Sequence, residues 1–317
     1  MMINIKKDKV GIPNRKRSLA KEIANQKYLM ILLLPSLIYY IIFRYVPMYG
    51  LIIAFKDYDF MSGIMGSPWV GLKYFKEFLQ GPYFGRLIRN TLKISITNLI
   101  FSFPLPIIFA LLLNELKNQR LKKLTQTVSY LPHFLSVVVV VGLLKQLLSP
   151  TSGVVNKVIS TVTGGDTINF FMEQNWFLPM YVSSGIWQEL GYSAIIYISA
   201  IAGIDPALYE AATVDGAGRW RRIWNITLPS ILPTISILLI LKLGSLLEVG
   251  YEKVLLMYNP SIYKVSDVIS TYVYRAGVQN ANYSFGTAVG LLNSIVAVIL
   301  IVISNKVSDK LSGNGLW

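Results

Sequence analysis

The sequence predicts an all-α integral membrane protein with six transmembrane helices, and three observations support this fold class. Of the 317 residues, 53% are hydrophobic and only 15% are charged, so the chain is more apolar than an ordinary soluble domain. Apolar runs recur that reach the roughly 20 residues a helix needs to cross the hydrocarbon core of a bilayer. Basic residues are also distributed unevenly among the segments that join these runs.

Six apolar runs qualify as membrane spans. The first contains Arg44 near its end, where a long side chain can reach the membrane surface. The second contains Pro104 and Pro106, which we expect to kink it or to end its regular part. The predicted spans are residues 28–46, 87–113, 124–148, 180–203, 231–247 and 285–304.

The basic residues predict the orientation. Six crossings place both termini on one side, and the segments of that side carry 17 Lys and Arg residues against 8 on the other. By the positive-inside rule the side with the termini is cytoplasmic. The net charge of +14 is then explained mostly by the orientation of the chain in the membrane. We therefore expect contact with membrane lipid and no nucleic-acid partner.

The predicted organisation follows from these spans. A basic cytoplasmic N-terminal segment (1–27) precedes a six-helix transmembrane domain (28–304), and a cytoplasmic tail (305–317) follows it. The outer segments are long enough to form short interfacial helices. These outer segments are residues 56–86, 149–179 and 248–284.

Few residues are available for metal, redox or nucleophilic chemistry. The chain has no cysteine and a single histidine, His133, so it offers no thiolate and no histidine cluster. We expect His133 to make a structural hydrogen bond. The sequence therefore predicts no catalytic residue and no metal site.

The cytoplasmic segment 205–229 has the pattern of two short helices. Asp205 can cap the first helix, Pro206 suits its first turn, and Gly216 is placed to end it. Ala211 and its neighbour form a thin helix face that a partner could approach closely, and Pro229 marks the turn back into the membrane. On this pattern alone, an ordinary amphipathic loop explains the segment equally well.

The spacing of its residues resembles a known motif. Glu210-Ala211-Ala212, then Gly216, then Ile226-x-Leu228-Pro229 resembles the EAA loop of bacterial ABC importer permeases, at every key position. The resemblance implies the type I importer permease fold, with a coupling helix held in a cleft of an ATPase subunit. The coupling residues that it implies are Glu210, Ala211, Ala212, Asp215, Gly216 and Arg219.

The chain itself lacks a nucleotide-binding motif. No Gly-Lys dipeptide occurs in it, so the glycine-rich phosphate loop that ends in Gly-Lys-Ser/Thr is absent. We therefore expect no cofactor in this chain and no enzymatic activity. ATP and Mg²⁺ would be bound by a partner ATPase.

Four further segments narrow the resemblance. Residues 69–75 and 90–92 resemble carbohydrate-uptake permeases, and residues 45–58 and 267–274 resemble the LplB-like branch of that family. The branch implies a second, homologous permease in a heterodimer, two ATPase subunits and an extracellular solute-binding lipoprotein in a bacterial plasma membrane. It also implies oligosaccharide or polysaccharide fragments as the substrate.

A sugar path through the membrane needs polar and aromatic side chains that face a cavity. Glu189 is the first candidate, because an ionisable residue within a span is by default a functional-site hypothesis. A hydrogen bond to a neighbouring helix explains it equally well. The predicted path residues are Asn98, Trp187, Gln188, Glu189, Tyr192 and Asn293.

Other functions remain open at this point. A secondary transporter would show paired inverted repeats with interrupted helices, and no convincing repeat is present. A membrane anchor would need no polar path, which the adjacent Gln188 and Glu189 argue against. A permease for another class of solute is the remaining alternative.

Overall fold

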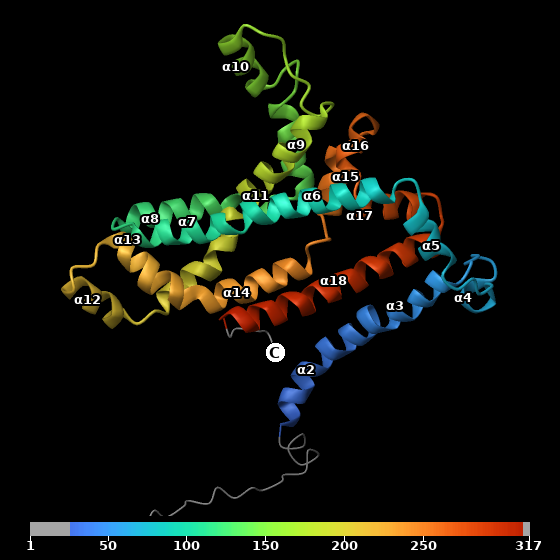
Figure 1. Ribbon diagram of the computed structural model, residues 1–317, viewed down its shortest axis with the longest axis horizontal. Helices are drawn as coiled ribbons and strands as arrows, with labels where there is room; N and C mark the ends of the chain where they lie inside the picture. The colour runs from blue at the N-terminus through green and yellow to red at the C-terminus, as the bar shows by residue number, and fades with distance from the viewer. Residues whose placement is uncertain (1–25, 313–317) are drawn as a thin grey trace, which may run out of the picture. The chain divides into compact units, whose positions relative to one another are not determined.

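The computed structural model describes residues 26–312, and nearly all of its regular structure is helical (Figure 1). An isolated antiparallel bridge between Lys56 and Trp69 is the one β feature in this part of the chain. The chain divides into two compact units, residues 1–52 and 53–317. The expected all-α class is confirmed.

A helix that is nearly continuous from Tyr28 to Phe55 makes up most of the described part of the first unit, and its last three residues belong to the second unit. Its most apolar stretch is exposed throughout, as expected for a helix whose surroundings are lipid tails rather than water. Arg44 lies in a π-helical segment near its middle. The consecutive elements are α2 (Lys27–Tyr40), η1 (Ile41–Tyr45), α3 (Val46–Met48) and η2 (Tyr49–Phe55).

Three further helices of the described residues are long and apolar enough to span a membrane: Phe84–Glu115, Arg219–Gly244 and Tyr283–Lys310. The first consists of α6 (Phe84–Ser102) and α7 (Pro104–Glu115), so the helix is interrupted next to the prolines as predicted. The second consists of α13 (Arg219–Arg222), η4 (Ile223–Thr227) and α14 (Leu228–Gly244), and the third lies in α18 (Tyr283–Ser312).

The predicted span over residues 124–148 is sharply bent. The helical stretches Gln119–Phe134 and Val137–Leu147 meet at an angle of 100°. Pro132 lies just before the bend, and the Ser136 hydroxyl accepts a hydrogen bond from the Val139 amide to cap the new helix. The elements are α8 (Gln119–Tyr130), η3 (Leu131–Phe134) and α9 (Val137–Leu147).

The predicted fourth span lies within the longer α11 (Gln174–Ala202), and a bend of 70° separates it from α12 (Pro206–Val214). Gly203 and Asp205 occupy this bend. Pro229 does not mark a turn, because the helix that begins at Arg219 continues through it. The widened π turn just before Pro229 accommodates a ring that would clash with the carbonyl four residues earlier in a regular helix.

Short helices occupy the three outer segments, as predicted. Residues 56–86 contain α4 (Gly63–Gly66) and α5 (Lys73–Gln80), and residues 149–179 contain α10 (Val154–Thr163). Residues 248–284 contain α15 (Tyr251–Met257), η5 (Pro260–Ile262), α16 (Tyr263–Ser266), α17 (Ile269–Val273) and η6 (Tyr274–Gln279).

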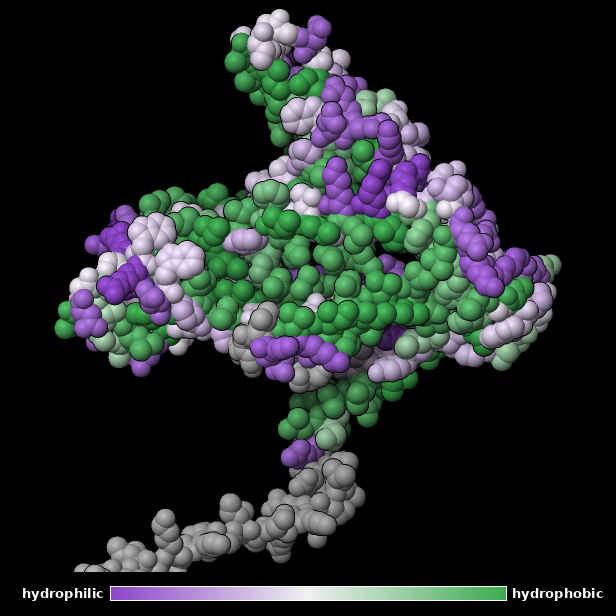
Figure 2. Space-filling view, in the orientation of Figure 1, coloured by the Kyte–Doolittle hydropathy of each residue, from purple (hydrophilic) through white to green (hydrophobic). Residues whose placement is uncertain are grey.

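Two of the three core clusters of the second unit include residues of α11, which contacts α6, α7, α8 and α14, and the third lies among α5, α6, α17 and α18. Gly191 lets α8 approach closely, because a Cβ at this position would collide with the backbone of Ser129. Figure 2 shows hydrophobic side chains over α6, α7, α14 and α18, and hydrophilic ones near α12 and α13 and near α5. This distribution matches an apolar band between two polar ends.

Candidate functional site

A polar cavity lies among α6, α7, α11, α14 and α15. It consists of three adjoining hollows of about 420, 280 and 190 Å³. Lys242 of α14 lines all three, Glu189 and Ser102 line the two larger ones, and Asn98 lines the two smaller ones. We call these hollows together the polar cavity.

Four of the six predicted path residues line this cavity: Asn98, Gln188, Glu189 and Tyr192. Trp187 and Asn293 do not line these hollows. The Trp187 side chain lies on another face of α11 and is half exposed, and Asn293 belongs to α18, with its side-chain oxygen buried without a hydrogen bond in the described structure. Successive residues of an α-helix point to different sides of it, so Trp187 does not face the cavity that Gln188 and Glu189 line.

Glu189 both lines the cavity and contacts a neighbouring element. Its Oε2 lies 3.0 Å from Nδ1 of His133, and the His133 ring stacks on Tyr192 with ring centres 3.6 Å apart. The predicted structural hydrogen bond of His133 is therefore present. His133 also lines the largest hollow, which the sequence analysis did not anticipate because the residue is isolated in the sequence.

Two lysines in the cavity wall were missed. Lys242 lies within the predicted fifth span, so the rule that singled out Glu189 could have found it. Lys253 belongs to α15, outside the membrane spans, and lines the middle hollow beside Tyr181 and Gly185. No sequence pattern pointed to it, because its position depends on contacts with α11.

Lys253 is buried, with 8% of its surface exposed. Its Nζ donates a hydrogen bond of 2.9 Å to the carbonyl oxygen of Tyr181 and lies 4.9 Å from the centre of that residue's ring. Burial lowers the pKa of the Lys253 ammonium to about 8, and the charge of Glu189 partly opposes this change.

Neither lysine of the cavity has a carboxylate partner. Among residues 26–312, the ion pairs within 4 Å include neither Lys242 nor Lys253. Glu189, a carboxylate in the same wall, already contacts His133. The cavity therefore presents two ammonium groups that an anionic guest could neutralise.

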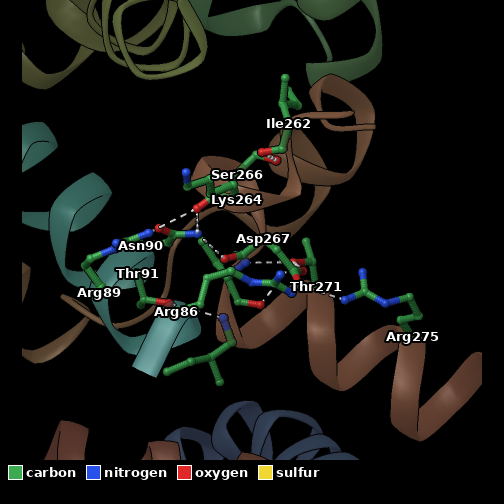
Figure 3. A network of polar contacts seen from close by, with 12 residues as sticks. Arg86, Arg89, Asn90, Thr91, Ile262, Lys264, Ser266, Asp267, Thr271 and Arg275 are labelled. Carbon is green, nitrogen blue, oxygen red and sulfur yellow. Dashed lines mark hydrogen bonds and ion pairs between the residues drawn. The ribbon is translucent and has the colours of Figure 1, made fainter. Parts of the chain in front are cut away.

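A buried ionic cluster anchors the segment that carries Lys253 to α6 (Figure 3). The fully buried carboxylate of Asp267 accepts hydrogen bonds from Arg86 (3.1 Å), Arg275 (2.8 Å) and Thr271 (3.0 Å). Asn90 of α6 donates to the carbonyl oxygens of Lys264 and of Asp267 itself. Asp267 opens the segment 267–274 that the sequence analysis singled out, so this motif has a structural function.

The first part of the segment 205–229 has the predicted local structure. Asp205 caps α12 through a 2.9 Å hydrogen bond from the amide of Ala207 to its carboxylate. Gly216 follows the helix with a φ of +72°, a conformation that glycine adopts without strain. The first short helix, α12, is thus confirmed, whereas α13 is not a separate short helix but the first turn of the helix Arg219–Gly244.

Five of the six expected coupling residues are exposed: Glu210, Ala211, Asp215, Gly216 and Arg219. Ala212 is half-buried. Nε of Arg219 lies 3.9 Å from the carboxylate of Glu115 at the end of α7, so this arginine also ties the loop to the predicted second span.

Comparison with known proteins extends these observations. The model of the family described as "binding-protein-dependent transport system inner membrane component" matches residues 102–311. The chain is 46% identical to the polygalacturonan/rhamnogalacturonan transport system permease protein YteP of Bacillus subtilis, over 96% of this chain and 94% of that protein. It is also 46% identical to protein LplB of the same organism, over 92% and 91% of the two chains.

Solved structures agree with the sequence comparison. A chain of a bacterial ABC transporter that imports the acidic polysaccharide alginate superimposes with a TM-score of 0.85 at 45% identity, over 93% of this chain and 99% of that one. A chain of the same kind of transporter, in complex with an alginate pentasaccharide-bound periplasmic protein, gives a TM-score of 0.86 at 44% identity, over 95% and 100%. The resemblance inferred from the loop therefore extends over almost the whole chain.

Proposed function

The chain belongs to the family of binding-protein-dependent transport system inner membrane components, and from this premise we propose that it carries acidic oligosaccharides through the polar cavity. It is a non-catalytic transmembrane permease subunit of an ABC importer, and ATP is hydrolysed by a separate subunit. A secondary transporter and a membrane anchor do not fit a member of this family.

One observation carries the acidic character of the substrate: Lys242 and Lys253 line one cavity without a carboxylate partner among the described residues. Lys253 is buried whereas Lys242 is exposed, and a buried ammonium group is stabilised by a hydrogen-bonded anion. The carboxylates of uronic acid units provide such anions. The relatives named for polygalacturonan and for alginate support the same class of substrate.

The remaining lining suits a saccharide. Asn98, Gln188 and Ser193 bring amide and hydroxyl groups to the wall, and these groups can exchange hydrogen bonds with sugar hydroxyls. The stacked rings of His133 and Tyr192 add an aromatic surface at the largest hollow. The lining of the largest hollow is mostly apolar, whereas the polar groups of the two smaller hollows fit a carbohydrate better than an apolar solute.

The proposed assembly contains a second, homologous permease in a heterodimer, two ATPase subunits that bind ATP and Mg²⁺, and an extracellular solute-binding lipoprotein. The exposed residues of α12 around Glu210 and Ala211 support the ATPase contact. The complex of a related transporter with a saccharide-bound periplasmic protein supports the binding protein. The basic bias of the predicted cytoplasmic segments supports the placement of both termini in the cytoplasm.

The experiment is ATP-dependent uptake by the complete importer in proteoliposomes. Two labelled substrates of equal length are compared: an oligogalacturonide and the same oligosaccharide after reduction of its carboxyl groups. We expect transport of the acidic form to exceed that of the reduced form by about tenfold, because one lost charge-assisted hydrogen bond corresponds to roughly that factor. Equal transport of the two forms would refute the acidic substrate class, and transport of neither would refute the proposed function.

A further inference from the structure

We infer that the hydrogen bond between Tyr209 and Thr227 is the joint through which α12 moves the span Arg219–Gly244, so that both are positioning residues for coupled transport. The inference rests on the proposed contact between α12 and the ATPase. It assigns a function to two residues outside the EAA motif positions.

Two side-chain contacts hold α12 against the start of the span. The Tyr209 hydroxyl lies 2.9 Å from the hydroxyl of Thr227, and Nη1 of Arg222 donates a 3.1 Å hydrogen bond to the hydroxyl of Thr213. Tyr209 and Thr213 are four residues apart, so they lie one turn apart on the same side of α12. The two contacts are therefore parallel, and they fix both the position and the rotation of the short helix.

The Tyr209 contact is the better shielded of the two. Thr227 is 1% exposed and Tyr209 is half-buried, whereas Thr213 is exposed. A hydrogen bond shielded from water is harder to replace, because its partners cannot turn to solvent when the bond breaks. The Arg222 contact is more readily replaced by water, so we place the joint at Tyr209 and Thr227.

A π-helical segment orients the Thr227 side chain toward α12. In η4 the turns close between residues five apart, and the Thr227 hydroxyl also lies 3.5 Å from the carbonyl oxygen of Arg222. Widened turns of this kind recur at functional sites. Here the segment aims Thr227 at α12, and Pro229 two residues later favours the widened turn.

The opposite side of α12 is free in the described structure. The side chains of Glu210, Ala211 and Val214 are exposed, Val214 by 88%. A partner that pushes on this side moves a nine-residue helix that is joined to the chain by two bends and by the contacts of Tyr209 and Thr213. The displacement passes through these contacts to the span.

The span itself reaches the polar cavity. The helix Arg219–Gly244 is continuous, with Thr227 in its first half and Lys242 near its end. Fifteen residues of helix separate the two, a distance of about 22 Å at 1.5 Å per residue. A movement of the helix at Thr227 is therefore transmitted to Lys242 in the cavity wall through continuous helix, with no loop between the two residues.

The experiment uses the complete importer with Tyr209→Phe, Thr227→Val and the double variant, each of which removes a hydroxyl with little change of shape. ATP hydrolysis and saccharide uptake are measured in the same proteoliposomes. We expect each single variant to lower the uptake per ATP hydrolysed about fivefold, the scale of one shielded hydrogen bond. The double variant should lose no more than either single one, because both remove the same bond.

Two control variants accompany them. Thr227→Ser keeps the hydroxyl and should retain the wild-type ratio. Ser230→Ala removes an exposed hydroxyl that bonds only within its own helix, to the carbonyl oxygen of Ile226, and should also leave the ratio unchanged.

The inference is overturned if the single variants keep the wild-type ratio, if their losses add in the double variant, or if the yield of assembled complex falls in parallel with transport. A wrong assignment of the substrate would give a different experimental result. In that case wild-type protein would transport no oligogalacturonide, while the binding protein would still stimulate ATP hydrolysis and the variants would still alter that stimulation.

Discussion

Nζ of Lys253 donates a 2.9 Å hydrogen bond to the carbonyl oxygen of Tyr181, across 72 positions of the sequence. This contact places a buried ammonium group of the outer segment in the wall of the polar cavity. A cation in such a position needs a compensating anion or loses its proton. Both outcomes can be measured.

Lys253→Gln should reduce the uptake of oligogalacturonide at neutral pH by about tenfold, because it removes one charge-assisted hydrogen bond to a carboxylate. Uptake of the carboxyl-reduced oligosaccharide should change little. Lys157→Gln, in the exposed part of α10, is the matched control. Equal losses for both substrates would show that Lys253 supports the structure and not the selectivity.

The same lysine predicts a pH dependence. Its pKa is lowered to about 8 by burial, so the ammonium is present below that pH and is lost as the pH rises through it. Uptake of acidic substrate should therefore fall between pH 7 and 9. Lys253→Arg keeps its charge over this range and should flatten the profile, and an unchanged profile in that variant would contradict the assignment.

Glu189→Gln should alter transport and leave assembly intact. The variant keeps the shape of the side chain and replaces the charge that faces His133. The transport rate and the amount of co-purified ATPase are measured together. If transport is unchanged, Glu189 serves only to hold His133 against Tyr192.

Asp267→Asn should destabilise the outer segment. The substitution leaves Arg86 and Arg275 without the anion that they share, and breaking a buried ion pair costs about 3 kcal/mol. A lower midpoint of thermal unfolding of the purified complex checks this. Asp166→Asn, in an exposed loop, should leave the midpoint unchanged, and equal midpoints for the two variants would argue against the cluster as an anchor.

Gly216→Val should uncouple ATP hydrolysis from uptake. At a φ of +72° a residue with a Cβ is strained by about 1–2 kcal/mol, and a β-branched one more so. The end of α12 must then rearrange. Gly218→Val is the matched control, because Gly218 has a φ of −66° and open space around its Cβ position. If Gly216→Val still couples ATP hydrolysis to uptake at the wild-type rate, the loop is not required for coupling.

Several features were predictable because their signals are local. The apolar runs marked where the spans lie, although the first helix continues nine residues beyond its predicted run and the fifth begins twelve residues before it. Asp205, Pro206 and Gly216 defined α12 through their own backbone preferences. The 100° bend after Pro132 was missed, because an apolar run alone does not show whether a helix continues through a proline.

The cavity was predictable only in part. Asn98, Gln188, Glu189 and Tyr192 were found because polar residues are conspicuous within apolar spans. Trp187 shares the same stretch of sequence, yet lies on another face of α11. Periodicity alone does not decide which face of a helix meets a neighbour when most of its faces are apolar.

The sequence by itself determined the membrane class, the number of apolar runs, helix α12 and the resemblance of its loop to the EAA motif, because each depends on residues close together in the chain. Only the tertiary structure brought Lys253 to Tyr181, Asp267 to Arg86 and Tyr209 to Thr227. The first two pairs form where segments that are distant in the sequence pack together, and the third forms across the loop that joins α12 to the span Arg219–Gly244. Their partners are selected by burial and hydrogen bonding in three dimensions, which no spacing along the chain encodes.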